Sequence, residues 1–76
     1  MKNWQAFVKD HMKIEVVDEN TIKVFNASWK PETLEYFDDV ICRNADGSYL
    51  VQTHDQINGG LVDTVEHETI RDYLGY

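Results

Sequence analysis

The sequence of 76 residues predicts a small α+β domain. We expect an antiparallel β-meander of about four or five strands, with an N-terminal and a C-terminal helix packed on one face. Three observations predict this class: apolar residues at helical spacing near both ends, alternating patterns in the middle, and short polar turn sequences between the alternating runs. No repeat, low-complexity tract or linker interrupts the chain, so residues 1–76 should form a single domain.

The first element is predicted to be a helix that Asn3 caps. Residues at i, i+3, i+4, i+7 and i+8 form a stripe on one face: Trp4, Phe7, Val8, His11 and Met12. On this stripe we expect His11 to be a packed, hydrogen-bonded imidazole. Residues 13–26 alternate with strand periodicity around the turn Asp18-Glu19-Asn20, which predicts a β-hairpin.

A second hairpin is predicted over about residues 36–53, and a short helical turn at 31–35 is compatible with the sequence before it. Pro31 cannot donate a ladder hydrogen bond, so the sheet pairing should end or be interrupted there. Three apolar residues of this region also suit a helix, an interpretation that stays open: Leu34, Phe37 and Ile41. The turn Asn44–Gly47 supplies the hairpin loop, with Gly47 free to take a positive φ.

The C-terminal part begins with a polar connection over residues 54–60, followed by a short strand around residues 61–65. A final helix carries three apolar residues at i, i+3 and i+4: Ile70, Tyr73 and Leu74. Glu66 and Glu68 suit the first turn of that helix, because carboxylates are favourable near a helix N-terminus. Gly75 is a suitable stop.

Charge is distributed unevenly along the chain, whose net charge is −7. Residues 1–30 carry five Lys and four acids, whereas residues 31–76 carry two Arg and ten acids. The acidic half would repel nucleic-acid phosphates directly, and it would attract and steer a basic protein surface. Carboxylates two residues apart on one strand face lie ~6.6 Å apart, a spacing compatible with mimicry of nucleic acid.

The predicted partner-binding residues are acids and tyrosines of this half: Glu32, Glu35, Asp38, Asp39, Asp63, Glu66, Glu68, Asp72, Tyr36, Tyr49 and Tyr76. The acids would supply the electrostatic attraction, and tyrosines suit the desolvated centre of an interface. We expect Asp38 and Asp39 to be an exposed pair of ordinary surface charges, without a pocket that would allow acid–base chemistry.

No catalytic constellation, metal site or cofactor is predicted. His11, His54 and His67 lack the spacing that places two metal ligands on one face of an element. Cys42 lies in an apolar strand context, where a buried and inert thiol is the expected outcome. As the single cysteine of the chain, it forms no internal disulfide.

The sequence therefore favours a small, acidic, non-catalytic domain that occupies the basic site of a nucleic-acid-binding protein. In size and acidity the chain is of the same general type as small phage-encoded inhibitors, including anti-restriction and anti-CRISPR proteins, and as antitoxins and immunity proteins. One alternative is a structural or assembly protein that forms a homodimer through an edge strand. A second alternative is a small metal-dependent enzyme that uses His54, His67 and Asp55.

The expected location is the cytoplasm, or the host cytoplasm for a phage-encoded protein. No apolar run approaches the ~20 residues of a membrane helix, and no stretch has the length of a signal peptide. The lone cysteine fits a reducing compartment. Neither membrane association nor direct nucleic-acid binding is expected.

Overall fold

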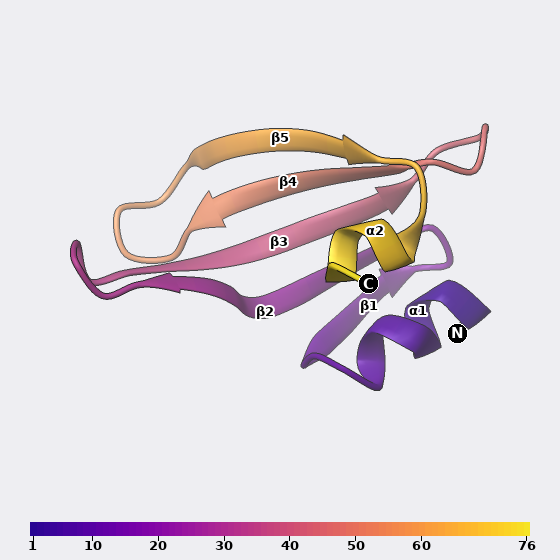
Figure 1. Ribbon diagram of the computed structural model, residues 1–76, viewed down its shortest axis with the longest axis horizontal. Helices are drawn as coiled ribbons and strands as arrows, with labels where there is room; N and C mark the ends of the chain where they lie inside the picture. The colour runs from indigo at the N-terminus through magenta and orange to yellow at the C-terminus, as the bar shows by residue number, and fades with distance from the viewer.

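The structure, a computed structural model, describes residues 1–76. Its elements are, in chain order, α1 (Asn3–Lys9), β1 (Ile14–Asp18), β2 (Thr21–Lys30), β3 (Glu35–Arg43), β4 (Tyr49–Asp55), β5 (Leu61–His67) and α2 (Ile70–Leu74). The strands form one antiparallel sheet in the order β1-β2-β3-β4-β5 (Figure 1). The predicted α+β meander with a helix at each end is thus confirmed.

The hydrophobic core lies between the two helices and one face of the sheet. Buried residues of both helices join alternate residues of β2, β3 and β4 in a single cluster: Trp4, Val8, Ile22, Val24, Ile41, Tyr49, Val51 and Ile70. Ile22 pairs with Ile41, and Ile41 pairs with Val51, so these three side chains lie in a row across one face. Because every core residue of the sheet points to the helices, the opposite face has no cover from the chain itself.

The helix starts differ from the prediction. Lys2, not Asn3, is the N-cap of α1, and the side chain of Gln5 accepts a hydrogen bond from the Lys2 amide at 2.8 Å. Gln5 is fully buried and also donates to the Asp18 carbonyl at 2.7 Å, which ties α1 to the end of β1. The capping role predicted for Asn3 was wrong, because the Gln5 side chain bonds the backbone of Lys2 and so fixes Lys2 as the N-cap.

The second helix begins later than its acidic residues suggest. Thr69 caps α2 by accepting a hydrogen bond from the Asp72 amide at 3.0 Å. Glu66 belongs to β5 and Glu68 precedes the cap, so neither lies in the first turn of the helix as predicted. Gly75 ends α2 in the left-handed conformation with φ 81°, as expected for a C-terminal glycine.

The strand boundaries follow the turn chemistry of the sequence. β2 ends at Lys30, directly before Pro31, and β3 begins at Glu35, so the helical interpretation of residues 34–41 was wrong. Gly47 has φ 91° in the turn between β3 and β4, as its place in the loop predicts. A register shift in β2 between Val24 and Ser28 bends the long β2–β3 hairpin.

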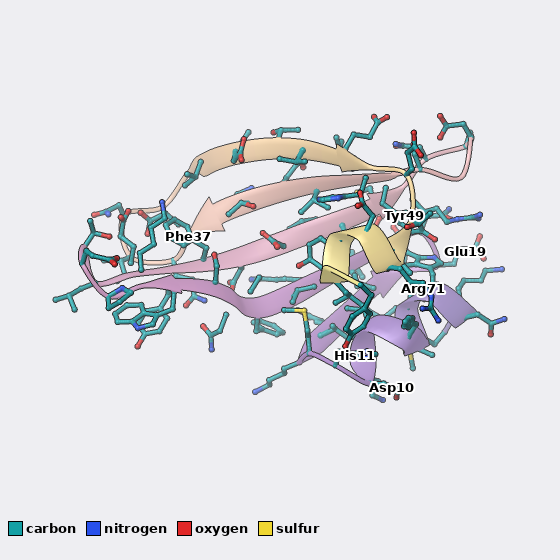
Figure 2. The ribbon with its side chains drawn as sticks, viewed as in Figure 1. Asp10, His11, Glu19, Phe37, Tyr49 and Arg71 are labelled. Carbon is teal, nitrogen blue, oxygen red and sulfur yellow. The ribbon has the colours of Figure 1, made fainter.

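The helices cover only one end of the sheet. The β2–β3 turn and the β4–β5 loop lie together at the other end (Figure 1). Figure 2 shows the same division, with Tyr49 and Arg71 near the helices and Phe37 at the uncovered end. None of the helices has the length and apolar character needed to cross a membrane.

Candidate functional site

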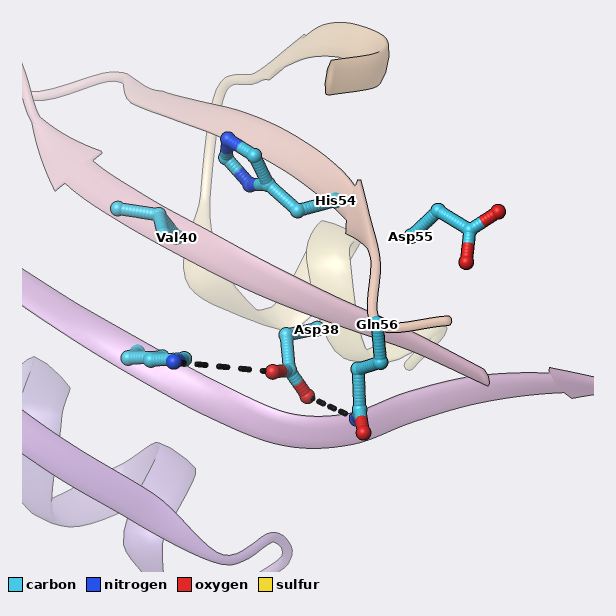
Figure 3. Close-up of a pocket in the computed structure, with 6 residues that line it drawn as sticks. Asp38, Val40, His54, Asp55 and Gln56 are labelled. Atoms are coloured by element: carbon cyan, nitrogen blue, oxygen red, sulfur yellow. Dashed lines mark hydrogen bonds and ion pairs between the residues drawn. The ribbon is translucent and has the colours of Figure 1, made fainter. Parts of the chain in front are cut away.

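The largest pocket opens on the face of the sheet that the helices leave bare, and its volume is about 500 Å³. Six residues of β2, β3, β4 and the loop after β4 line it: Lys23, Asp38, Val40, His54, Asp55 and Gln56 (Figure 3). Val40 is the one apolar side chain among them. Side chains of both charge signs and an amide make this depression suited to a polar group rather than an apolar one.

The Asp38 side chain of the pocket is held by three neighbours. Its carboxylate accepts hydrogen bonds from the Asn26 amide at 2.9 Å and from Gln56 Nε2 at 2.5 Å. Lys23 Nζ lies 3.8 Å from its other oxygen, and the residue is only 8% exposed. The prediction of an exposed pair was wrong for Asp38, because the register shift at Asn26 directs a backbone amide at this carboxylate.

His54 lies opposite Asp38 in the pairing of β3 with β4. Its Nδ1 is buried and has no hydrogen-bond partner. Acid–base catalysis by an imidazole needs a neighbouring group that orients the ring and a reacting group within hydrogen-bond reach. The Asp38 carboxylate is already engaged by Asn26, Gln56 and Lys23, so the pocket offers recognition of a polar group rather than an assembled proton-transfer pair.

Asp55 holds the β4–β5 loop in shape. Its carboxylate accepts hydrogen bonds from the Asn58 side chain at 3.0 Å and from the Asn58 and Ile57 amides at 3.1 and 2.8 Å. These bonds, led by that of the Asn58 side chain, lower the pKa of Asp55 to about 2. Asp55 therefore positions the loop rather than a substrate or a metal ion.

Asp39 points to the opposite face from Asp38 and ties α2 to the sheet. It accepts hydrogen bonds from Tyr73 Oη and from Thr53 Oγ1, both at 2.6 Å, and it is 8% exposed. Burial, together with the hydrogen bond to Asp39, raises the pKa of the Tyr73 hydroxyl above its usual value. The second member of the predicted exposed pair is therefore also an internal structural group.

The three predicted tyrosine anchors have different environments. Tyr49 is buried in the core against Trp4, with ring centroids 5.1 Å apart, so it was wrongly placed at a binding surface. Tyr76 is exposed and lies near the ring of Phe7. Tyr36 is exposed and stacks on Trp29 at the end of the sheet that the helices do not cover.

The predicted acids that remain on the surface form two groups. Four exposed acids follow one another along β5 and into α2, and we call this set the acidic edge: Asp63, Glu66, Glu68 and Asp72. Asp72 is also hydrogen-bonded to His67 Nδ1 at 2.9 Å. The other two acids, Glu32 and Glu35, lie at the turn between β2 and β3. The structure therefore does not gather all eight predicted acids on one face.

Sequence reasoning named Tyr36 at this turn but missed its exposed neighbours Trp29 and Leu34. Trp29, Leu34 and Tyr36 are all exposed, and we call these three residues the hairpin tip. One feature of the sequence could have indicated this surface: the aromatic residues Trp29 and Tyr36 flank the turn at Pro31, and aromatic residues in such positions can pair across a hairpin.

The histidines and the cysteine do not come together as a metal site. His54 and His67 lie on opposite faces of the sheet, and no group of three potential ligands forms, which contradicts the alternative built on His54, His67 and Asp55. His11 follows α1 and is exposed, but it is hydrogen-bonded and packed as predicted: Nδ1 is bonded to the Phe7 carbonyl at 2.8 Å, and the ring lies against those of Phe7 and Tyr76. Cys42 is half-buried and lies 3.6 Å from Thr21 Oγ1.

Comparisons with protein-family models, with curated proteins and with solved structures find no match for this chain.

Proposed function

We propose that this chain is a non-catalytic protein-binding domain that takes up a basic, extended segment of a partner along the acidic edge. The observation that carries the proposal is the position of β5, which has a strand partner on one side only. Six of its seven residues are exposed, among them Leu61, Val62 and Val65. An unpaired strand of this kind offers a row of backbone donors and acceptors to another chain.

The two edges of the sheet differ in how they are protected. β1 has five residues and is tied to α1 through Gln5, and its pairing contains one register irregularity, as does that of β5. β5 has seven residues, two more than β1, and like β1 it contains neither Lys nor Pro, the residues that commonly discourage pairing at an edge. β5 is therefore the edge better suited to accept a further strand.

Charge defines the chemistry of the partner. Asp63 and Glu66 project from β5, and Glu68 and Asp72 continue the same charge beyond it. Asp63 and Val65 share one face of β5, and Glu66 lies on the other. An added strand that alternates Lys or Arg with apolar residues would therefore set its bases against the acids of one face and its apolar residues against the other face. Affinity should fall as the ionic strength rises, because exposed charges are screened.

The partner class that best matches this chemistry is a protein whose basic site otherwise holds nucleic acid. The acidic edge supports a partner of this class because it presents negative charge along an extended strand, as a nucleic-acid backbone does. Duplex DNA or single-stranded RNA should then compete with the chain for the partner protein. A partner retained equally well with and without competing nucleic acid would exclude mimicry and leave simple protein binding.

The first test is a titration of the ¹⁵N-labelled protein followed by NMR. The probe is a capped peptide that alternates Lys and Val, about eight residues long so that it spans β5. We expect shifts concentrated in the amides of residues 61–68, and none with a peptide that alternates Glu and Val. The triple variant D63K/E66K/E68K should lose the response.

A matched control separates a local effect from net charge. The variant D10K/E15K/E19K makes the same change of net charge, from −7 to −1, on exposed residues near α1 and β1. It should keep most of the β5 response. If both triple variants bind alike, or if the Lys–Val peptide leaves β5 unchanged, the acidic edge is not the binding surface.

The same strand supports a second candidate, a homodimer through β5. An antiparallel pairing of two copies centred on Thr64 would place Asp63 opposite Val65 and Glu66 opposite Val62. No like charges would then face each other directly. Sedimentation equilibrium distinguishes the candidates: a dimer that forms with rising protein concentration and is insensitive to salt favours self-assembly, whereas a monomer that binds the basic peptide favours the first proposal.

A further inference from the structure

The β2–β3 hairpin extends beyond the part of the sheet that the helices cover (Figure 1). Trp29 and Tyr36 pair across it, and their rings stack with centroids 4.1 Å apart and planes 22° apart. They remain 43% and 42% exposed, so the stack fixes their geometry without removing them from water. Trp and Tyr are among the residues that most often dominate binding energy at interfaces.

Leu34 is an unfavourable residue for its position. Its φ is 55°, in the left-handed region where a side chain with a Cβ is strained, and it is 66% exposed. A glycine would accept this conformation, and an exposed leucine recovers little stability from burial. Neither the turn nor the core accounts for a leucine here, and strain of this kind is found at binding sites.

The surroundings of the hairpin tip give it a partly apolar and partly acidic character. The β4–β5 loop lies beside it, because the Gln56 amide donates to the Tyr36 carbonyl at 2.9 Å, and that loop carries the exposed Ile57. Glu32 is exposed in the turn, whereas Glu35 is half-buried and pairs with Lys30 across the hairpin, on the face opposite the Trp29–Tyr36 stack. Lys30, the nearest base in sequence, is directed to the Phe37 ring at 5.4 Å.

We propose that the hairpin tip holds an apolar side chain of the partner, flanked there by Lys or Arg. This inference rests on the proposed function, since it assigns the hydrophobic anchor of the same basic partner. Charge complementarity selects this occupant: Glu32, the exposed acid of the turn, forms no ion pair, so it attracts a basic segment and disfavours an anionic membrane surface. The anchor residue would pack on Leu34 and the Trp29–Tyr36 stack.

The test uses the indole N–H signal of Trp29, which NMR resolves from that of the buried Trp4 and which a W29F variant assigns. The probe is a capped peptide that alternates Lys and Leu, with a Glu–Leu peptide as the control. The Lys–Leu peptide should shift the Trp29 signal and the amides of residues 33–36. The Glu–Leu peptide should shift neither.

The variant L34G separates binding from folding. It should leave the melting temperature equal to or above that of the wild type, since glycine tolerates a positive φ, while weakening the peptide about fivefold or more. W29A should weaken the peptide further. V17A, which trims an exposed apolar residue of β1, should bind like the wild type.

The outcomes distinguish the two proposals. If the Lys–Leu peptide shifts β5 but not Trp29, or if L34G and W29A bind like the wild type, the hairpin tip is not an anchor and the acidic edge stands alone. If neither surface responds, both the inference and the proposed function are wrong. A folded L34G protein with weakened binding supports the inference.

Discussion

Replacing Tyr73 by Phe removes one hydroxyl group and tests how α2 is held on the sheet. Tyr73 Oη donates to Asp39 Oδ2 at 2.6 Å, and Asp39 receives its other side-chain hydrogen bond from Thr53. Because Asp39 is 8% exposed, water cannot freely replace the lost donor. The ring of Tyr73 stays in place, so the change in apolar packing is small.

A hydrogen bond to a charged group contributes about 1.5–3 kcal/mol to stability. For a domain of this size, each kcal/mol corresponds to roughly 4–8 °C in the melting temperature. Y73F should therefore lower the melting temperature by roughly 6–24 °C, measured by differential scanning calorimetry at pH 7. Y76F removes the same atom from an exposed tyrosine, and it should change the melting temperature by no more than about 2 °C.

The comparison between these two variants decides the point. If Y73F melts within about 2 °C of Y76F, the bond between Tyr73 and Asp39 does not hold α2, and the structural role assigned to Asp39 is wrong. In that case Asp39 would again be available as a binding residue. A large loss of stability that T53V reproduces would place the effect at the Asp39 carboxylate itself.

The remaining predictions concern pH. The pKa of Tyr73 is raised in the folded protein, so above the ordinary value of 10.0 the unfolded chain loses a proton that the native state keeps, and stability falls as the pH rises. Y73F should show a smaller loss in thermal melts between pH 9 and pH 11, and parallel curves would contradict the assignment. The pKa of Asp55 is lowered to about 2 from 3.8, so its stabilisation is present above pH 3.8 and lost as the pH falls toward 2. D55N should melt below the wild type at pH 7, and this gap should close toward pH 2; a constant gap would mean that the charge of Asp55 does not hold the loop.

The order of the elements could be predicted because it depends on local patterns. Alternation around the turn at residues 18–20, the polar loop that ends in Gly47, and the proline after Lys30 all act within a few residues of the structure that they determine. The errors at the helix starts have a different origin. The start of α1 depends on Gln5 reaching the Asp18 carbonyl, a contact between elements that no local pattern encodes.

The roles of the acids could not be predicted from the sequence for the same reason. Asp38 accepts hydrogen bonds from Asn26 and Gln56 and forms an ion pair with Lys23, and these three residues lie 12 to 18 residues away in the chain. Asp39 is bonded to Tyr73, which lies 34 residues away. Adjacent acids point to opposite faces of a strand, and only the register of the sheet decides which groups each of them meets.

The length of the β2–β3 hairpin connects the two proposed surfaces. Ile22 and Val24 of β2 are buried in the core and Ala27 packs against it, yet the strand continues to Lys30. Beyond the register shift, the paired segments bury Phe37 but leave Trp29, Leu34 and Tyr36 exposed. Since the helices never reach this end, the extension adds little to the core and instead holds the hairpin tip beside the loop that leads into β5. A partner segment lying along the acidic edge would thus meet an apolar surface where β5 begins, so that attraction by charge along the strand and anchoring by aromatic rings at its start would act on the same segment.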